Sequence, residues 1–141
     1  MLKKTILFLS YDSGFFYAWL DDDSGSSAVF CCQVNDLLRG RTGEEVVADL
    51  TTIVRALKAA GCRVILFTVP PFDMTGVAKD YWYYANDKIR LTIANEADAV
   101  FDFAAVLGQP APNAHLSIYG GHPNAEGCAV AAKAYLAVKL L

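Results

Sequence analysis

Residues 119–127 have the sequence Tyr-Gly-Gly-His-Pro-Asn-Ala-Glu-Gly, and an alanine-rich segment follows them. Two glycines loosen the chain just before His122, and Asn124 is a favourable N-cap for a helix after the loop. The pattern therefore predicts an imidazole presented at a helix start. A second signal lies upstream, where the apolar pattern Ala28–Gln33 leads into Asn35. An asparagine after a strand and a histidine on a loop are two parts of an acyl-transfer site.

Four short apolar runs predict buried strands: Thr5–Leu9, Ala28–Gln33, Arg63–Val69 and Ala99–Phe103. They are continuous rather than alternating, which is typical of a parallel sheet covered on both faces. Helical patterns separate most of them, so the chain is predicted to form a three-layer α/β/α sandwich with right-handed crossovers. A length of 141 residues suits one domain, residues 1–141, and 55% hydrophobic residues can fill its core without disulfides or metal.

The clearest helix is predicted at Thr42–Ala60. Thr42 and Glu45 form a capping box, apolar residues recur at helical spacing on one face, and Gly61 can take the positive φ that ends many helices. A second helix is predicted at Asp80–Ala97. Its inner face is expected to carry Trp82, Ala85, Ile89 and Ile93.

The connection between Leu9 and Ala28 is the least regular part of the pattern. It holds an aromatic cluster followed by three aspartates, and it leaves room for a helix of about two to three turns at most.

Charge and hydropathy exclude several classes of protein. The net charge is −3 and the 12 Lys and Arg residues are scattered, which argues against binding to nucleic acid or an anionic membrane. No segment approaches the ~20 apolar residues of a membrane span. The apolar run after Lys4 is too short for a signal peptide and no cleavage site follows it, so we interpret it as the first strand.

The four cysteines, Cys31, Cys32, Cys62 and Cys128, form no C-x-x-C motif and no zinc-like spacing with histidine. We interpret them as small buried apolar residues in a reducing compartment. The sequence therefore predicts a cytoplasmic location.

Candidate catalytic residues follow the predicted strands. In parallel α/β sheets, sites form beyond the carboxyl ends of the strands. Ser13 follows the first strand, Asn35 the second, and His122 lies beyond the fourth, so all three are expected to meet at one edge. His122 can act as a general base, Ser13 as a nucleophile on a turn, and Asn35 as an amide donor to an oxyanion.

Each of these residues also has an ordinary structural interpretation. His122 can simply bond a backbone carbonyl, Ser13 can be a turn or N-cap serine, and Asn35 can cap the strand–helix loop. The other histidine, His115, lies in a proline-rich loop and is the weaker candidate. Asp36 is expected to cap a helix or to pair with Arg39 or Arg41.

Neither a metal nor a cofactor is predicted. Asp21, Asp23 and Gly25 are spaced like part of a calcium loop, but the glycine at position six and the terminal glutamate of that loop are missing. A solvated acidic turn is the preferred interpretation. A flavodoxin-like nucleotide or receiver module is disfavoured, because no phosphate-binding glycine loop follows the first strand.

With these residues in view, the chain resembles the SGNH hydrolases, the GDSL-type esterases and lipases, most strongly over Ala28–Leu141. Ala28–Arg41 is similar to the third family block, a strand followed by Gly-x-Asn-Asp, and Gly120–Ala132 is similar to the fifth, Asp-x-x-His-Pro-Asn-x-x-Gly. Gly61–Pro71 resembles the family's strand ending in Val-Pro, and Val100–Asp102 its late strand ending in Asp.

The resemblance implies a flavodoxin-like sandwich, with about four strands in this chain, and hydrolysis of a small-molecule carboxylic ester through an acyl-serine. It implies that Ser13 is the nucleophile, that His122 is the base and that Asn35 is an oxyanion donor. Gly25 is the one residue that can stand in for the glycine of the second block.

The chain departs from the family pattern in several places. Tyr119 stands where the triad acid belongs, Gln33 replaces the third-block glycine, and Tyr11 replaces the first-block glycine. Ser13 and Asn35 are only 22 positions apart, which is too short for the family's usual helix and strand. A second hypothesis is therefore a non-catalytic relative that acts as a binding or oligomeric module. A homo-oligomer would cover the exposed edge of a shortened sheet.

Overall fold

The main sheet has five strands in the computed structural model, which describes residues 5–11, 14–20, 27–31, 34–71, 76–108, 117–118 and 122–138. The strands are β1 Thr5–Tyr11, β2 Gly14–Leu20, β3 Ser27–Cys31, β4 Arg63–Phe67 and β5 Ala99–Phe101. Their spatial order is β2-β1-β3-β4-β5, which is the strand order of flavodoxin-like folds. β1, β3, β4 and β5 are mutually parallel, and β2 runs antiparallel to β1.

The four parallel strands lie where the continuous apolar runs predict them, and the α/β sandwich is confirmed. The main difference concerns residues 14–20, which form β2, a strand that the sequence pattern did not predict. β1 and β2 pair through their whole length, from Thr5 opposite Leu20 to Tyr11 opposite Gly14. Aromatic residues favour such extended, paired backbone.

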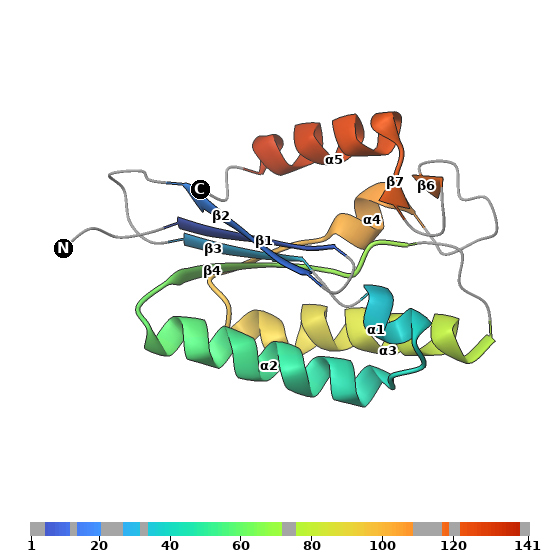
Figure 1. Ribbon diagram of the computed structural model, residues 1–141, viewed down its shortest axis with the longest axis horizontal. Coiled ribbons are helices and arrows are strands. Elements are labelled where there is room, and N and C mark those ends of the chain that lie inside the picture. The colour runs from blue at the N-terminus through green and yellow to red at the C-terminus, as the bar shows by residue number, and fades with distance from the viewer. Residues whose placement is uncertain are drawn as a thin grey trace.

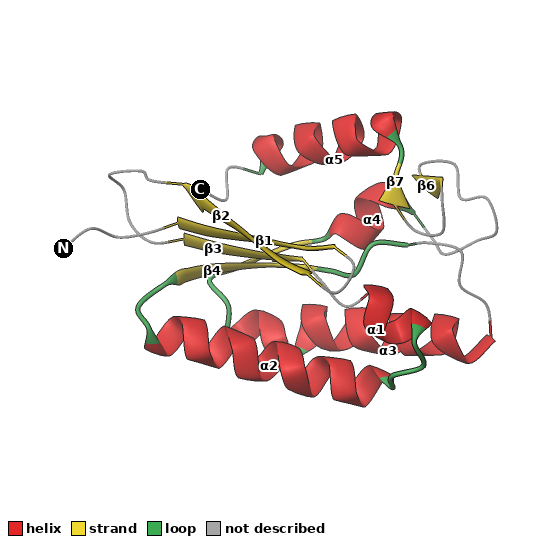
Figure 2. Cartoon of the chain, in the orientation of Figure 1, coloured by secondary structure: helices red, strands yellow, loops and turns green. Residues whose placement is uncertain are grey.

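Helices cover both faces of the sheet (Figures 1 and 2). On one face lie α1 Val34–Leu38, α2 Gly43–Ala59 and α3 Gly76–Leu91. On the other lie α4 Phe103–Leu107 and α5 Ala125–Ala137. The remaining elements are the 3₁₀ helix η1 Ile93–Asn95 and the two-stranded sheet of β6 Ser117–Ile118 and β7 His122–Pro123.

α2 begins and ends as the sequence predicts. The Thr42 hydroxyl accepts a hydrogen bond from the Glu45 amide at 3.2 Å, and the Glu45 carboxylate accepts one from the Thr42 amide at 2.8 Å, which completes the capping box. Gly61 follows the helix with φ +79°. A Cβ on Gly43 would lie 2.7 Å from Tyr84 Cδ1, so the start of α2 packs closely against α3.

α3 runs from Gly76 to Leu91, whereas the prediction was Asp80–Ala97. It ends earlier than predicted because the chain continues as the 3₁₀ helix η1. The predicted inner face is nevertheless confirmed. Its four residues are all buried in the core between α2, α3 and β4: Trp82, Ala85, Ile89 and Ile93.

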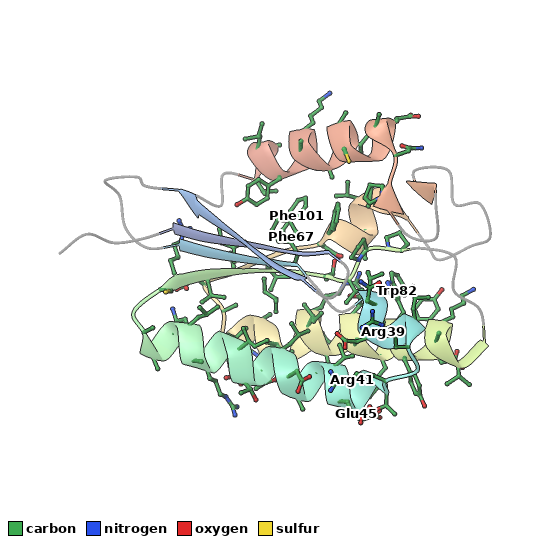
Figure 3. The ribbon with its side chains drawn as sticks, in the orientation of Figure 1. Arg39, Arg41, Glu45, Phe67, Trp82 and Phe101 are labelled. Carbon is green, nitrogen blue, oxygen red and sulfur yellow. The ribbon has the colours of Figure 1, made fainter. Side chains whose placement is uncertain are left out.

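An aromatic cluster packs α4 and α5 onto the other face of the sheet. The Phe67 and Phe101 rings, labelled in Figure 3, lie between the strands and α5. Their centroids lie 5.4 and 5.3 Å from the Tyr135 ring of α5, and the Phe103 ring of α4 lies 5.9 Å from Phe67. The sheet, α4 and α5 therefore share one cluster.

Two cysteines can be compared with the prediction of buried thiols. Cys62 is buried, but Cys128 on α5 is exposed, and both are free thiols. The prediction is thus wrong for Cys128, because the helix turns that position toward solvent. Within the described ranges, every helix is too short or too polar to cross a membrane.

Candidate active site

The carboxyl ends of the parallel strands define the edge of the sheet at which the candidate site is predicted. β1 ends at Tyr11, β3 at Cys31, β4 at Phe67 and β5 at Phe101. Figure 1 shows α1 and the β6–β7 pair at this same end of the molecule, on the right of the view. This is the edge at which ligands bind in open α/β folds.

Asn35 lies in α1, just after β3, and its side chain is half-buried. Leu37 holds the helix to the core, with 1% of its surface exposed. An ion-pair network adds a second anchor, in which Arg41 donates to Asp36 at 3.3 Å and to Asp49 of α2 at 2.6 Å. The predicted Asp36–Arg41 pair is thus confirmed. The bonds to Asp49 and then Asp36 raise the pKa of Arg41.

His122 has its backbone in β7, opposite Ile118 of β6. The chain then enters α5, where the Asn124 side chain accepts a hydrogen bond from the Gly127 amide at 2.7 Å, so the predicted N-cap is confirmed. The histidine therefore lies in a short antiparallel pair directly before a capped helix, rather than on a free loop. The imidazole itself is outside the described side chains.

The remaining predicted site residues, Ser13 and Gly25, lie outside the described residues, as do His115, Tyr119 and Gln33. Ser13 directly precedes Gly14, whose partner across the ladder is Tyr11 at the carboxyl end of β1. The structure therefore brings the elements that carry Asn35 and His122 to one edge of the sheet. Whether the hydroxyl of Ser13 joins them stays a prediction.

A polar network at this edge was not predicted from the sequence. Asp102, directly after β5, accepts two hydrogen bonds from the Arg90 guanidinium. Nε donates to Oδ2 at 2.9 Å, and Nη2 donates to Oδ1 at 2.8 Å. The hydroxyl of Thr68 donates to Asp102 Oδ1 at 2.9 Å and accepts from the Ala104 amide at 2.8 Å. The Ala105 amide also donates to Asp102 Oδ1, at 3.1 Å. Arg90, Asp102 and Thr68 are called the edge network below.

Electrostatics keep Asp102 ionised in this network. Burial alone would raise its pKa, but the hydrogen bonds from Arg90, Ala105 and Thr68 outweigh that effect and hold the pKa of Asp102 below its ordinary value of 3.8. The same contact raises the pKa of Arg90. The fork of the guanidinium and the carboxylate thus form a charged pair with fixed geometry.

A second polar cluster fixes the chain just beyond β4. The side-chain oxygen of Asn86 accepts a hydrogen bond from the Val69 amide at 2.7 Å, and its Nδ2 donates one to the Val69 carbonyl at 3.0 Å. Trp82 Nε1 donates to the Val69 and Pro70 carbonyls at 2.9 and 3.1 Å. Asn86 and Trp82 are both buried, so the backbone at the carboxyl end of β4 is held by side chains of α3.

The described residues offer few further reactive groups at this edge. Among them, His, Cys, Asp and Glu form no group that could hold a metal ion. Asp102, the carboxylate at the end of β5, already accepts hydrogen bonds on both oxygens.

Comparison with known proteins identifies relatives of this arrangement. Residues 20–130 match the family model of the GDSL-like lipase/acylhydrolase family. A search of curated proteins found no match.

Two solved structures are similar. A member of the lipolytic protein G-D-S-L family from Veillonella parvula DSM 2008 has a TM-score of 0.65 and 25% identity, with 83% of this chain and 64% of that chain covered. A proposed acylhydrolase from Bacteroides fragilis NCTC 9343 has a TM-score of 0.63 and 20% identity, with 82% and 61% covered. The second supports the fold alone. The chain spans less than two thirds of the length of either relative.

Proposed function

Because the chain belongs to the GDSL-like lipase/acylhydrolase family, we propose that it cleaves a small carboxylic ester through an acyl-serine intermediate. Ser13 is the nucleophile, His122 is the general base, and Asn35 with the backbone amide of Gly25 stabilises the oxyanion. The observation that supports this proposal most is the position of α1, which carries Asn35, and β7, which carries His122, at the carboxyl edge of one parallel sheet.

The reaction follows the usual order of acyl transfer. His122 takes the proton of the Ser13 hydroxyl as its oxygen attacks the ester carbonyl, and the carbonyl oxygen becomes an oxyanion that Asn35 stabilises. His122 then gives the proton to the leaving alcohol. Water, activated by the same imidazole, releases the acid and restores the serine.

The acid of the triad is the missing part. Tyr119 occupies the position three residues before His122, and the carboxylate of Asp102 is already engaged by Arg90. We therefore propose a Ser–His dyad in which a backbone carbonyl holds the imidazole. Because loss of an orienting acid costs about 10⁴-fold in a serine protease, we expect slow turnover.

Hydrolysis of short-chain p-nitrophenyl esters tests the proposal. Ser13→Ala and His122→Ala should each lower kcat by about a thousandfold, and Asn35→Ala by about a hundredfold, because they remove the nucleophile, the base and an oxyanion donor. Ser10→Ala and His115→Ala are matched controls that should keep the parent rate. If Ser13→Ala and His122→Ala both retain the parent rate, the mechanism is wrong.

A second candidate function is a non-catalytic relative that binds a ligand or a partner. It is favoured by Tyr119 in place of the triad acid and by the short interval from Ser13 to Asn35, which are only 22 positions apart and have the antiparallel β2 between them. A fluorophosphonate probe separates the two candidates. Labelling that disappears in Ser13→Ala supports the enzyme, and absence of labelling in the folded parent supports the binding module.

A homo-oligomer remains the predicted protein partner. β2 is the last strand on one side of the sheet and pairs with β1. Among the described strands, none pairs with its other side, so a second copy of the chain could pair there. Sedimentation equilibrium tests this, and a monomer at all concentrations would contradict it. The cytoplasmic location likewise stays a prediction.

A further inference from the structure

The edge network joins all three layers of the sandwich. Arg90 comes from α3 in one helical layer, and Thr68 and Asp102 directly follow the strands β4 and β5 of the sheet. The amides of Ala104 and Ala105 belong to the first turn of α4 in the other helical layer. Thr68 is completely buried, so its hydroxyl has a donor and an acceptor partner in a setting without competing water.

α4, which the edge network holds, packs against the helix that follows His122. α4 and α5 contact each other, and α5 contacts β7. Phe103 of α4 and Tyr135 of α5 both pack on Phe67, which adds a second link between the two helices. Because Asn124 caps α5 directly after the His122–Pro123 strand, the position of α5 determines where the histidine backbone lies.

We propose that Thr68, Asp102 and Arg90 are positioning residues for His122, acting through α4 and α5. The inference rests on the proposed function only in giving His122 the role of base. Tyr119 leaves the imidazole without the family's neighbouring acid, so its placement depends more on the backbone that carries it. The edge network is suited to this task because a bidentate arginine–carboxylate pair fixes direction as well as distance.

The substitution Thr68→Val tests the proposal without changing charge. Valine keeps the shape of threonine but removes the hydroxyl, so Asp102 loses a donor and the Ala104 amide loses its acceptor. Thr68→Ser keeps the hydroxyl and is the matched rescue variant. We expect Thr68→Val to lower kcat by about tenfold with KM unchanged within about twofold, and Thr68→Ser to stay close to the parent.

Histidine NMR supplies a readout that does not depend on turnover. The chain has two histidines, so a His115→Gln background leaves the ring signals of His122 alone. In Thr68→Val these ring signals should shift, while Thr68→Ser keeps the parent spectrum. In a second pair of variants, Arg90→Gln should shift the His122 signals fully and Arg90→Lys only partly. Lysine keeps the positive charge but cannot form the two parallel hydrogen bonds of the guanidinium.

Val54→Ala is the control for general destabilisation, because Val54 lies in the core between α2 and the sheet, outside the edge network. The proposal is overturned if Val54→Ala changes the His122 signals as much as Thr68→Val does. It is also overturned if Thr68→Val and Arg90→Gln both leave the signals unchanged. An inactive parent would contradict the esterase, but the NMR comparison would still decide the positioning role.

Discussion

Asp98 and Asp102 lie at opposite ends of β5, a strand of three residues, yet they connect it to the molecule in different ways. Asp98, before the strand, accepts hydrogen bonds from Lys58 of α2 at 2.7 Å and from the Val64 amide of β4 at 2.6 Å. Asp102, after the strand, accepts from Arg90, from buried Thr68 and from the start of α4. The first carboxylate joins β5 to β4 and to one helical layer, whereas the second connects both helical layers to the sheet.

The amino and carboxyl edges of the sheet likewise differ in how deeply their polar contacts are buried. At the amino edge, the ion pair of Arg55 with Glu96 is largely exposed on the arginine side, and such pairs contribute little to stability. At the carboxyl edge, the polar side chains of Thr68 and Asn86 are fully buried and hydrogen-bonded. At the edge with the candidate site, buried polar groups therefore specify the geometry. Loss of one hydrogen-bond partner there costs more stability than at the exposed edge.

The largest effect is expected for Asn86→Ala. It removes both hydrogen bonds to Val69 and leaves a buried backbone N–H without its acceptor, which should cost about 2–3 kcal/mol. The matched variant is Asn95→Ala near the amino edge, where an exposed amide donates to the Leu91 carbonyl at 3.3 Å. Asn95→Ala should change the free energy of unfolding by less than about 0.5 kcal/mol. Urea unfolding measures both, and equal losses would contradict the difference between the edges.

The amino acid sequence predicted the elements whose signals are local. The capping box of Thr42 and Glu45 and the glycine at 61 define α2 almost to the residue, because both act within one helical turn. The continuous apolar run predicted β4 because its central residues, Val64, Ile65 and Leu66, are buried on both faces of the sheet. Asn124 predicted the start of α5 for the same local reason.

Elements that depend on distant partners were not predictable. The strand β2 is defined by its pairing with β1, and a run such as Phe15-Phe16-Tyr17 does not state which partner it will have or in which direction. The Asp102 contacts with Thr68 and Arg90 bridge positions 34 and 12 residues apart. The sequence showed Asp102 at a strand end and Arg90 in a helix, but nothing local indicated that the two would meet.

An intermediate effect is expected when each aspartate of β5 is neutralised. In Asp102→Asn, an amide N–H₂ must face the donors of the Arg90 guanidinium. We therefore expect the free energy of unfolding to fall by about 1.5–2 kcal/mol at pH 7. In Asp98→Asn, the remaining carbonyl oxygen can still accept from the Val64 amide, so the loss should stay near 1 kcal/mol or less. Thermal or urea unfolding at pH 7 compares the two variants at identical net charge.

The pH dependence of the same pair sharpens the comparison. The folded-state pKa values of Asp98 and Asp102 both lie below the ordinary 3.8, so the stability they add is fully present above that value. It is lost as the pH falls below 3.8 and through the lower folded-state pKa values. The difference between parent and Asp102→Asn should therefore shrink between about pH 5 and pH 2. A difference that stays constant down to pH 2 would mean that the carboxylate charge adds nothing.

A small effect of opposite sign is expected for Tyr135→Phe on α5. The Tyr135 hydroxyl is buried and makes no hydrogen bond with the described residues, and burial raises its pKa against the opposing charge of Arg63 at the amino end of β4. Phenylalanine keeps the ring contacts with Phe67 and Phe101 and removes a polar atom without a partner, so the variant should be more stable by about 1 kcal/mol.

The control is Tyr84→Phe, which alters a half-exposed tyrosine beside Lys88 and should leave the free energy of unfolding nearly unchanged. A clear loss of stability in Tyr135→Phe would mean that the hydroxyl is hydrogen-bonded after all. A gain would mean that a buried polar atom of α5 is unpaired, whereas the buried polar side chains of Thr68 and Asn86 are hydrogen-bonded. Burial alone would then not decide whether a polar atom in this fold has a partner.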